Sequence, residues 1–289
     1  MQQLRELGVQ IKGHPATGYQ LNAMPELLLP EILDPLLYGV RIGNRIHHYF
    51  SVGSTNTEAM NAGARGEPEG AVFLAEEQTA GRGRGSHTWK SEPSVGIYCS
   101  TLLRPPLSPA DALPITLMAG LSVAEAVQLV TGLRPDLRWP NDLLLGRKKF
   151  CGILTEMNSE ATRVSYVVVG IGINVNHSSF AGELVPIATS LRMEGGREWS
   201  RVELTAALLK SLDNGYRKLI EDPDGTRRHV IHNFEEQSSY ARGLHVHIVE
   251  EPGFEGMTEG LDERGFLRVR TASGVRTVLS GTVRRADEK

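Results

Sequence analysis

Five short apolar runs, which have the length and composition of buried strands, constrain the fold more than any other feature of this sequence. They cover residues 71–75, 97–103, 143–145, 152–157 and 164–173. Long segments with helical spacing of apolar residues are fewer, at 108–130, where Pro114 fits a first helical turn, and at 201–220. A doubly wound sheet needs a helix between most pairs of strands, so this irregular alternation excludes it. The pattern predicts a mixed sheet with a few covering helices.

The sequence changes character near Ser238, where short strand-like runs replace the helical segments. These runs cover residues 246–249, 254–260, 266–270 and 276–279, and turns such as 262–265 separate them. Four or five strands within about 50 residues are typical of a small barrel. We therefore expect a separate β-domain at the C-terminal end.

The first residues have the pattern of a fragment. An amphipathic helical run carries Leu4, Leu7, Val9 and Ile11, and a turn at 14–18 leads into a short strand at 19–21. Half a helix and a hairpin cannot bury a core alone, so this piece packs on the rest or ends a larger unit. Residues 24–35, which contain prolines, are expected to be a connector.

Charge and cysteine content exclude several classes of protein. The 31 basic and 34 acidic side chains give a net charge of -3, so contact with phosphate or nucleic acid requires a local cluster. The two cysteines, Cys99 and Cys151, provide neither a disulfide framework nor a zinc motif. Because no run approaches the roughly 18 apolar residues of a membrane helix and no signal peptide is evident, we expect a cytoplasmic protein without a membrane partner.

The most unusual segment is 78–90, QTAGRGRGSHTWK, in which glycines alternate with Arg82 and Arg84. Exposed backbone N–H groups and guanidinium groups suit a multiply charged anion, above all phosphate. The alternative is a flexible, solvated loop. Trp89 favours the first interpretation, because a tryptophan that closes a basic loop can stack on a purine.

Three further clusters carry polar groups beside apolar runs. In 138–142, RWPND, Asp142 is placed to hold magnesium with nucleotide phosphates, or else forms an Asx-turn. Lys149 lies at the start of the next strand. It is either a cation placed for a reacting carboxylate or phosphate, or an ordinary residue at the edge of the strand. In 167–176, VVVGIGINVN, Gly170 and Gly172 either let a flat ligand approach the backbone, with Asn174 contacting the edge of a base, or mark a strand bulge. Ser54 either caps a helix over 56–64 or holds a small polar ligand with its neighbours.

These clusters together resemble biotin protein ligases in order and approximate spacing. The resemblance rests on Ser54-Thr55-Asn56, the Gly81–Trp89 loop, Trp139-Pro140-Asn141-Asp142, residues 149–152 and Gly170-Ile171-Gly172-Ile173-Asn174. It implies an α+β fold, in which a central mixed β-sheet is flanked by helices as in class II synthetases and lipoate ligases, with an SH3-like C-terminal β-barrel. It also implies two steps, in which biotin and ATP give biotinyl-5′-adenylate and the biotinyl group then passes to a lysine of a biotin carrier domain. The carboxylate of biotin is the first nucleophile, so no Ser-His-Asp or Cys-His arrangement is required.

The resemblance also implies roles for individual residues. Catalysis would rest on Lys149, Arg82 and Arg84, because the enzyme must bring two anions together and stabilise charge on the α-phosphate. Biotin would be bound by Ser54, Thr55, Asn56, Gln78, Gly81, Arg82, Gly83, Arg84, Lys149 and Gly152. ATP would be bound by Arg84, His87, Trp89, Asn141, Asp142, Lys149 and Asn174, with Asp142 as the magnesium ligand.

Residues 1–22 resemble the end of a winged helix-turn-helix, 23–236 a catalytic domain and 237–289 the SH3-like domain. The helices that would enter a major groove are absent from this chain, so specific operator binding is not expected. The sequence also departs from the family pattern, because Gly85-Ser86-His87 replaces a further Gly-Arg and Thr282 stands where an acidic residue is common. The first departure removes a residue that usually contacts phosphate in the family, and the second changes the barrel segment that usually helps ATP binding.

Other functions remain open at this point. They are a lipoate or octanoate ligase, whose Arg-Arg-(x)-Ser-Gly-Gly-Gly loop is not found here; a repressor within a longer product; and a nucleotide-binding module without turnover. Pairing of family members through sheet edges favours a homodimer. Six arginines without an acid in 264–285 either face an acidic carrier or form the solvated side of barrel strands.

Overall fold

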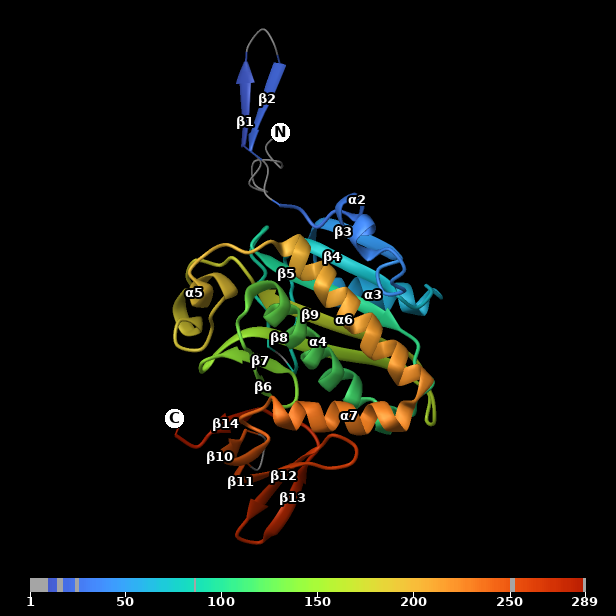
Figure 1. Ribbon diagram of the computed structural model, residues 1–289, viewed down its shortest axis with the longest axis vertical. Helices are drawn as coiled ribbons and strands as arrows, with labels where there is room; N and C mark the ends of the chain where they lie inside the picture. The colour runs from blue at the N-terminus through green and yellow to red at the C-terminus, as the bar shows by residue number, and fades with distance from the viewer. Residues whose placement is uncertain (1–9, 15–17, 24–25, 86, 250–252, 288–289) are drawn as a thin grey trace.

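The structure is a computed structural model that describes residues 10–14, 18–23, 26–85, 87–249 and 253–287. Figure 1 shows a hairpin at one end, a central body of sheet and helices, and a small β-domain at the other end. The hairpin consists of β1 (Gln10–His14) and β2 (Gly18–Ala23), which are antiparallel, so the predicted strand at 19–21 is confirmed, whereas residues 15–17 of the predicted turn lie outside the described residues. Ile11 lies in β1, and a helix reaching Ile11 is therefore wrong; Leu4, Leu7 and Val9 fall outside the described residues.

The body contains a seven-stranded sheet of order β3-β4-β5-β9-β8-β7-β6. Only the β3–β4 pair is parallel, so the predicted mixed sheet is confirmed. The strands are β3 (Arg45–Val52), β4 (Ala71–Gln78), β5 (Gly96–Leu103), β6 (Asp136–Arg138), β7 (Asp142–Leu145), β8 (Lys148–Ser159) and β9 (Val164–Asn174).

Helices cover both faces of this sheet, because alternate side chains of a strand point to opposite faces. On β4, Val72 and Leu74 join the large core under α4 (Leu113–Thr131) and α6 (Arg201–Glu221), while Phe73 packs with α3 (Thr55–Ala64). All eight residues of β5 are buried, as expected for a strand that is covered on both faces.

Helix α4 contains Pro114 in its first turn, as predicted. Within the described ranges, the stretch Pro109–Thr131 is the one that is long and apolar enough to cross a membrane, but 67% of its apolar window is buried inside the protein. Its neighbours are α6, α7 (Pro223–Glu236) and the sheet. It is the central core helix of this body.

The segment after the hairpin is more than a connector. It contains the short helices α2 (Pro30–Leu33) and η1 (Asp34–Leu37), and it buries Leu28 and Leu33 completely. The remaining short elements are η2 (Pro109–Asp111), η3 (Gly182–Leu184) and α5 (Leu191–Gly195).

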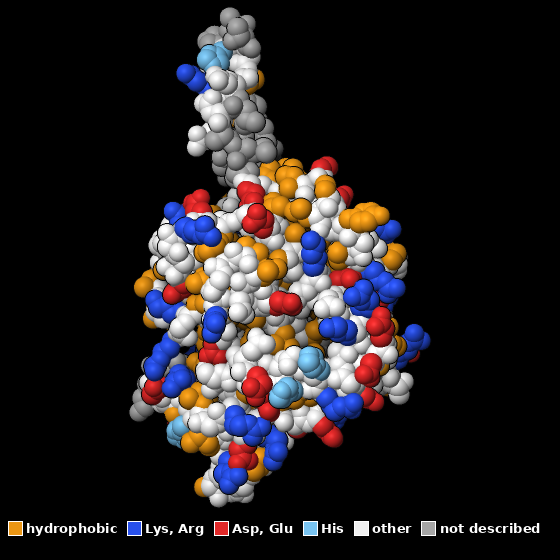
Figure 2. Space-filling model, viewed as in Figure 1, with side chains coloured by type: hydrophobic (Ala, Val, Ile, Leu, Met, Phe, Trp, Pro, Cys, Tyr) orange, Lys and Arg blue, Asp and Glu red, His pale blue; other side chains and the backbone are white. Residues whose placement is uncertain are grey.

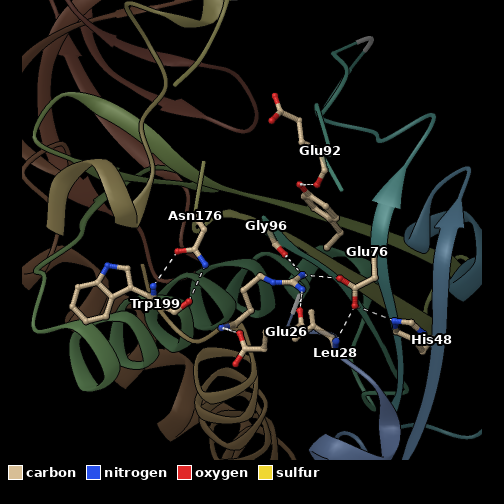
Figure 3. A network of polar contacts seen from close by, with 10 residues as sticks. Glu26, Leu28, His48, Glu76, Glu92, Gly96, Asn176 and Trp199 are labelled. Carbon is tan, nitrogen blue, oxygen red and sulfur yellow. Dashed lines mark hydrogen bonds and ion pairs between the residues drawn. The ribbon is translucent and has the colours of Figure 1, made fainter. Parts of the chain in front are cut away.

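A buried network ties this segment to the sheet (Figure 3). The Glu76 carboxylate of β4 accepts from the Leu28 backbone N–H at 2.8 Å and from Arg201 at 2.8 Å, and it contacts His48 at 3.1 Å. Burial alone would raise the pKa of Glu76, but the His48 hydrogen bond and the Arg201 charge outweigh it and hold the pKa below its usual value. The charge of Arg201, whose side chain is 1% exposed, is therefore compensated inside the core.

The C-terminal β-domain has five antiparallel strands in the order β13-β12-β11-β10-β14. The strands are β10 (Arg242–Ile248), β11 (Phe254–Leu261), β12 (Leu267–Thr271), β13 (Gly274–Val278) and β14 (Val283–Arg285). The predicted small β-domain is confirmed. It joins the body through the buried Trp139 side chain, whose indole N–H donates to the carbonyl of Gly265 at 2.9 Å.

Candidate functional site

The N-terminus of α3 supplies three buried polar residues, Ser54, Thr55 and Asn56. Ser54 occupies the predicted N-cap position with extended backbone, but its side chain makes no capping hydrogen bond. The backbone N–H and hydroxyl of Thr55 donate to Gln78 Oε1 at 2.9 and 3.1 Å, and Gln78 Nε2 donates to Ser91 at 2.9 Å. Thr55 and Gln78, which are far apart in sequence, thus share one polar corner.

Asn56 lies against the sheet. Its Nδ2 donates to the carbonyl of Leu154 at 3.2 Å and to Glu156 Oε2 at 3.0 Å, while Ser100 Oγ lies 2.6 Å from its Oδ1. A Cβ on Gly170 would lie 2.0 Å from that Oδ1, so glycine is required there by close approach. Ser100 and Glu156 were not predicted as site residues; the available signal for Ser100 was the polar pair Ser100-Thr101 inside the largely apolar β5 run.

The glycine-rich segment is a folded hairpin in the described residues 78–85 and 87–91. Arg82 pairs with Thr88 in an antiparallel bridge, and the Trp89 N–H donates to the carbonyl of Gly81 at 2.9 Å. A Cβ on Gly81 would lie 2.3 Å from the carbonyl oxygen of Trp89, so the base of the hairpin also requires glycine. The alternative of a loop that is only solvated does not describe this segment.

Both predicted arginines of this hairpin are held by neighbours. Arg82 forms an ion pair with Glu156 at 2.7 Å, although its side chain remains 48% exposed. Arg84 donates to Asn141 Oδ1 and to the carbonyl of Gly281, each at 3.2 Å. Arg84 therefore connects the hairpin, the central sheet and the C-terminal domain.

Trp89 lies over a floor formed by two glycines. A Cβ on Gly172 would lie 2.5 Å from the indole, and one on Gly152 would lie 3.0 Å from it. Lys149 Nζ is 5.5 Å from the indole centroid, and the indole N–H is buried without a hydrogen-bond partner in the described part of the chain. The glycine pair therefore admits a flat group, which here is the indole itself.

Lys149 and Asp142 form an ion pair beside the first cavity. Lys149 Nζ lies 2.5 Å from Asp142 Oδ1, and Arg138 donates to Asp142 Oδ2 at 2.7 Å. Burial would raise the pKa of Asp142, but the charges of Lys149 and Arg138 outweigh it and keep the pKa below its ordinary value. The backbone of Lys149 is also fixed, since its N–H donates to the carbonyl of Ile187 at 2.8 Å and its carbonyl accepts from Thr189 at 3.0 Å.

These residues do not fit a magnesium ion. Both carboxylate oxygens of Asp142 already have cationic partners, and the described ranges contain no group of three His, Cys, Asp or Glu side chains that would hold a metal. Magnesium prefers several oxygen ligands that are free to coordinate it. No chemical step is therefore assigned to a metal bound by Asp142.

Most of the predicted site residues line two adjoining cavities. The first has a volume of about 50 Å³, and the second, of about 1080 Å³, shares Trp89 and Lys149 with it. Of the predicted residues, the first is lined by Ser54, Thr55, Asn56, Gln78, Arg82, Gly83, Arg84, Trp89, Asn141, Lys149 and Gly152. The second is lined by His87, Trp89, Lys149 and Asn174.

Gly81 and Asp142 line neither cavity: Gly81 lies at the base of the hairpin and Asp142 lies beside Lys149. Asn174 is buried, and its Nδ2 already donates to the carbonyl of Thr189 at 3.1 Å. Cys99 lines the first cavity, but burial raises the pKa of its thiol to about 12, and burial also raises the pKa of Cys151. Neither cysteine is therefore a ready nucleophile.

Comparison with known proteins agrees with this geometry. Residues 51–174 match the biotin/lipoate A/B protein ligase family, and residues 245–284 match the biotin protein ligase C terminal domain. The chain is 32% identical to the bifunctional ligase/repressor BirA of Bacillus spizizenii, over 98% of this chain and 87% of that protein.

Solved structures are also similar. The biotin protein ligase from Aquifex aeolicus in complex with biotin and ATP has a TM-score of 0.72 and 30% identity, covering 84% of this chain and 100% of that chain. The biotin protein ligase from Leishmania major in complex with biotinyl-5-AMP has a TM-score of 0.57 and 25% identity, covering 82% of this chain and 99% of that one.

Proposed function

This chain belongs to the biotin protein ligase family, and from that premise we propose how its own residues divide the two-step reaction. The supporting observation is that two cavities with different linings meet at Lys149. The first would hold biotin and the second ATP, so that the biotin carboxylate and the α-phosphate come together beside one cation. Such positioning replaces a covalent enzyme nucleophile.

In the first step, a carboxylate oxygen of biotin attacks the α-phosphorus, and the bond from that phosphorus to the bridging oxygen breaks. Pyrophosphate leaves with the bonding electrons. Lys149 stabilises the negative charge that develops at the phosphorus, and Arg82 and Arg84 reduce the repulsion between the two anions. In the second step, the neutral amine of a carrier lysine attacks the acyl carbon of biotinyl-5′-adenylate and the bond from that carbon to the phosphate oxygen breaks. AMP leaves with the bonding electrons, and the nitrogen releases one proton as the amide forms.

The polar corner of α3 is assigned to the biotin head group. Ser54, Thr55, Asn56 and Gln78 offer donors and acceptors at one end of the first cavity, and Gly83 and Gly152 leave room along it. At the other end, Asn141 and Arg84 stand where the carboxylate would meet ATP. Gly81 has an indirect role, since it permits the fold of the hairpin.

The adenosine of ATP is assigned to the second cavity, with Trp89, His87 and Asn174 as contacts. Asp142 acts here as the carboxylate that orients Lys149. Magnesium enters only as the ion that accompanies the phosphates of ATP.

Further parts of the proposal concern partners and organisation. We expect a biotin carboxyl carrier domain as acceptor, a cytoplasmic location and domains over 1–22, 23–236 and 237–289. A homodimer stays a prediction that gel filtration and light scattering would test. Specific operator binding by the chain as given stays unexpected, and nanomolar binding in physiological salt would contradict that expectation.

Pyrophosphate release from ATP tests the proposal with biotin, lipoate and octanoate as the competing acids. Biotin alone is expected to support release and subsequent transfer to a carrier domain. Release with lipoate or octanoate but not with biotin would overturn the assignment of the first cavity. The similarity to the bifunctional ligase/repressor BirA of Bacillus spizizenii makes a ligase that also represses transcription the second candidate, and operator titration with and without biotin and ATP tests it.

A further inference from the structure

Glu156 on β8 is a charged residue that no step of the proposed reaction uses, although it contacts two residues of the site. Figure 2 shows acidic and basic side chains interspersed over the visible face of the body, so an ion pair at the surface is not by itself a functional feature. The pair of Glu156 with Arg82 differs, because the same carboxylate also reaches Asn56. Oε1 accepts from Arg82 at 2.7 Å, and Oε2 accepts from Asn56 Nδ2 at 3.0 Å. Glu156 lines neither cavity, so it acts through these two partners.

The register of the sheet brings the partners of Asn56 together. Ser100 of β5 is paired with Gly170 of β9, and Gly170 is paired on its other side with Leu154 of β8. The Asn56 amide lies over this row, because its Nδ2 donates to the Leu154 carbonyl at 3.2 Å and a Cβ on Gly170 would lie 2.0 Å from its Oδ1. Glu156 follows Leu154 by two residues, so its side chain faces the same side of β8. The carboxylate therefore stands beside the amide nitrogen.

The carboxylate decides which way the Asn56 amide points. An ionised carboxylate only accepts hydrogen bonds, as does the Leu154 carbonyl, whereas the two hydrogens of Asn56 Nδ2 can only be donated. These two acceptors use both hydrogens. Oδ1 must then point toward Ser100, whose hydroxyl donates to it at 2.6 Å. The amide of Asn56, which lines the first cavity, can therefore offer a ligand a lone pair of Oδ1 but no donor.

We propose that Glu156 is a positioning residue of the first cavity, which fixes the Asn56 amide as an acceptor for an N–H group of the bound acid. This inference rests on the proposed function and deepens it, since it names the feature of the biotin head group that the site selects. The cyclic urea of biotin carries N–H donors, whereas the dithiolane ring of lipoate and the alkyl end of octanoate carry none. An acid without such a donor leaves a buried acceptor unpaired, and its binding is weaker for that reason.

The other oxygen of Glu156 connects the glycine-rich hairpin to the same group. The Arg82 side chain is 48% exposed and that of Glu156 is 23% exposed. An ion pair with one exposed partner contributes little by itself. Here the hydrogen bond from Asn56 holds the carboxylate from the other side, so one side chain places both the asparagine and the arginine. Substitution by glutamine keeps the size of the side chain and removes only the charge that sets the direction of the hydrogen bonds.

The experiment titrates the whole chain and Glu156→Gln with biotin and with the two biotin analogues in which oxygen replaces one or the other ureido N–H. In the wild type, we expect at least one analogue to bind about tenfold more weakly than biotin, because its ring oxygen meets Asn56 Oδ1. The glutamine amide can donate as well as accept, so Asn56 is free to turn its Nδ2 toward the cavity. In Glu156→Gln the ratio of the two affinities should therefore fall to about twofold or less.

Two further variants separate positioning from a general loss of structure. Glu160→Gln neutralises an exposed acid just beyond the end of β8 that lines neither cavity, and it should keep the wild-type ratio. Ser100→Ala removes the donor to Asn56 Oδ1 but leaves the carboxylate in place. In Ser100→Ala, biotin and the analogues should therefore change in affinity together, and the ratio should stay as in the wild type. Melting temperatures check that each variant is folded.

A ratio in Glu156→Gln equal to that of the wild type for both analogues would overturn the inference and leave the proposed function standing. The same holds if the wild-type chain binds both analogues as tightly as biotin, or if Ser100→Ala lowers the ratio as far as Glu156→Gln does. A wild-type chain that does not bind biotin would reject the proposed function itself, and the inference with it. In an active enzyme, Glu156→Gln should raise the KM for biotin and leave the KM for ATP unchanged.

Discussion

Replacing Lys149 by methionine removes the ammonium group and keeps most of the length of the side chain. Lys149 Nζ lies 2.5 Å from Asp142 Oδ1, with exposed side-chain fractions of 30% and 13%. Breaking a buried pair costs roughly 3–5 kcal/mol, because one charge is left uncompensated. Here Arg138 still contacts the other carboxylate oxygen at 2.7 Å, so we expect a smaller loss, on the order of 1–2 kcal/mol in the free energy of unfolding.

The effect on catalysis should be much larger. Loss of one positioned electrostatic group typically lowers kcat by about 10²–10³, and Lys149→Met should fall in or beyond that range for biotin-dependent pyrophosphate release. Urea unfolding measures the stability of the same preparation. Because Lys149 helps to hold the pKa of Asp142 below its unfolded value, the wild type loses this stabilising contribution as the pH falls through that range, and the variant, in which the pKa is depressed less, should lose less stability on acidification.

Lys148→Met is the matched control for this variant. Lys148 is the preceding residue of β8, and its Nζ donates to the carbonyl of Val185 at 3.1 Å in an exposed position. It should retain nearly wild-type activity and stability. Equal kcat values for Lys149→Met and Lys148→Met would refute the role given to Lys149.

Three other predictions concern separate parts of the protein. Gly170→Ala places a Cβ 2.0 Å from Asn56 Oδ1 and should weaken biotin binding at least tenfold in a direct titration; unchanged affinity would contradict the role of Asn56. Burial lowers the pKa of His177 from 6.5 to about 4. Between these two pH values the unfolded chain binds more protons than the folded chain, so acid lowers the free energy of unfolding by about 3 kcal/mol. His177→Phe should flatten that part of the pH profile of urea unfolding. Arg201→Met leaves the fully buried Glu76 without its guanidinium and should cost about 3–5 kcal/mol by the same measurement, and a loss below 1 kcal/mol would show that Glu76 is compensated by its other partners.

Strand and helix positions inside the core could be predicted because their apolar periodicity is strong. β9 and α4 show this, since the apolar runs at 164–173 and 108–130 lie close to their observed bounds. β3 and α7 were not predicted. β3 is an edge strand with mixed polarity, and α7 buries only Val230 and Phe234.

The candidate site was partly predictable for a related reason. Glycine and polar clusters such as 81–84 and 54–56 stand out locally, whereas partners on other strands do not. Glu156 is 100 residues from Asn56 and meets it only because β8 passes α3. The contact of Arg84 with Gly281 depends on how two domains pack, which local sequence does not encode.

The placement of Trp89 gives the protein a built-in optical probe. Of the three tryptophans, Trp139 and Trp199 are buried and donate their indole N–H groups to the carbonyls of Gly265 and Leu191. Trp89 is half-buried at the junction of the two cavities, with its indole N–H not bonded to any described residue. We expect a ligand that shifts this indole from the glycine floor to change the polarity of its surroundings and its distance from the Lys149 charge, and the two buried, hydrogen-bonded indoles to respond less. Intrinsic fluorescence should therefore report occupancy of the site without a label, at each step of a titration.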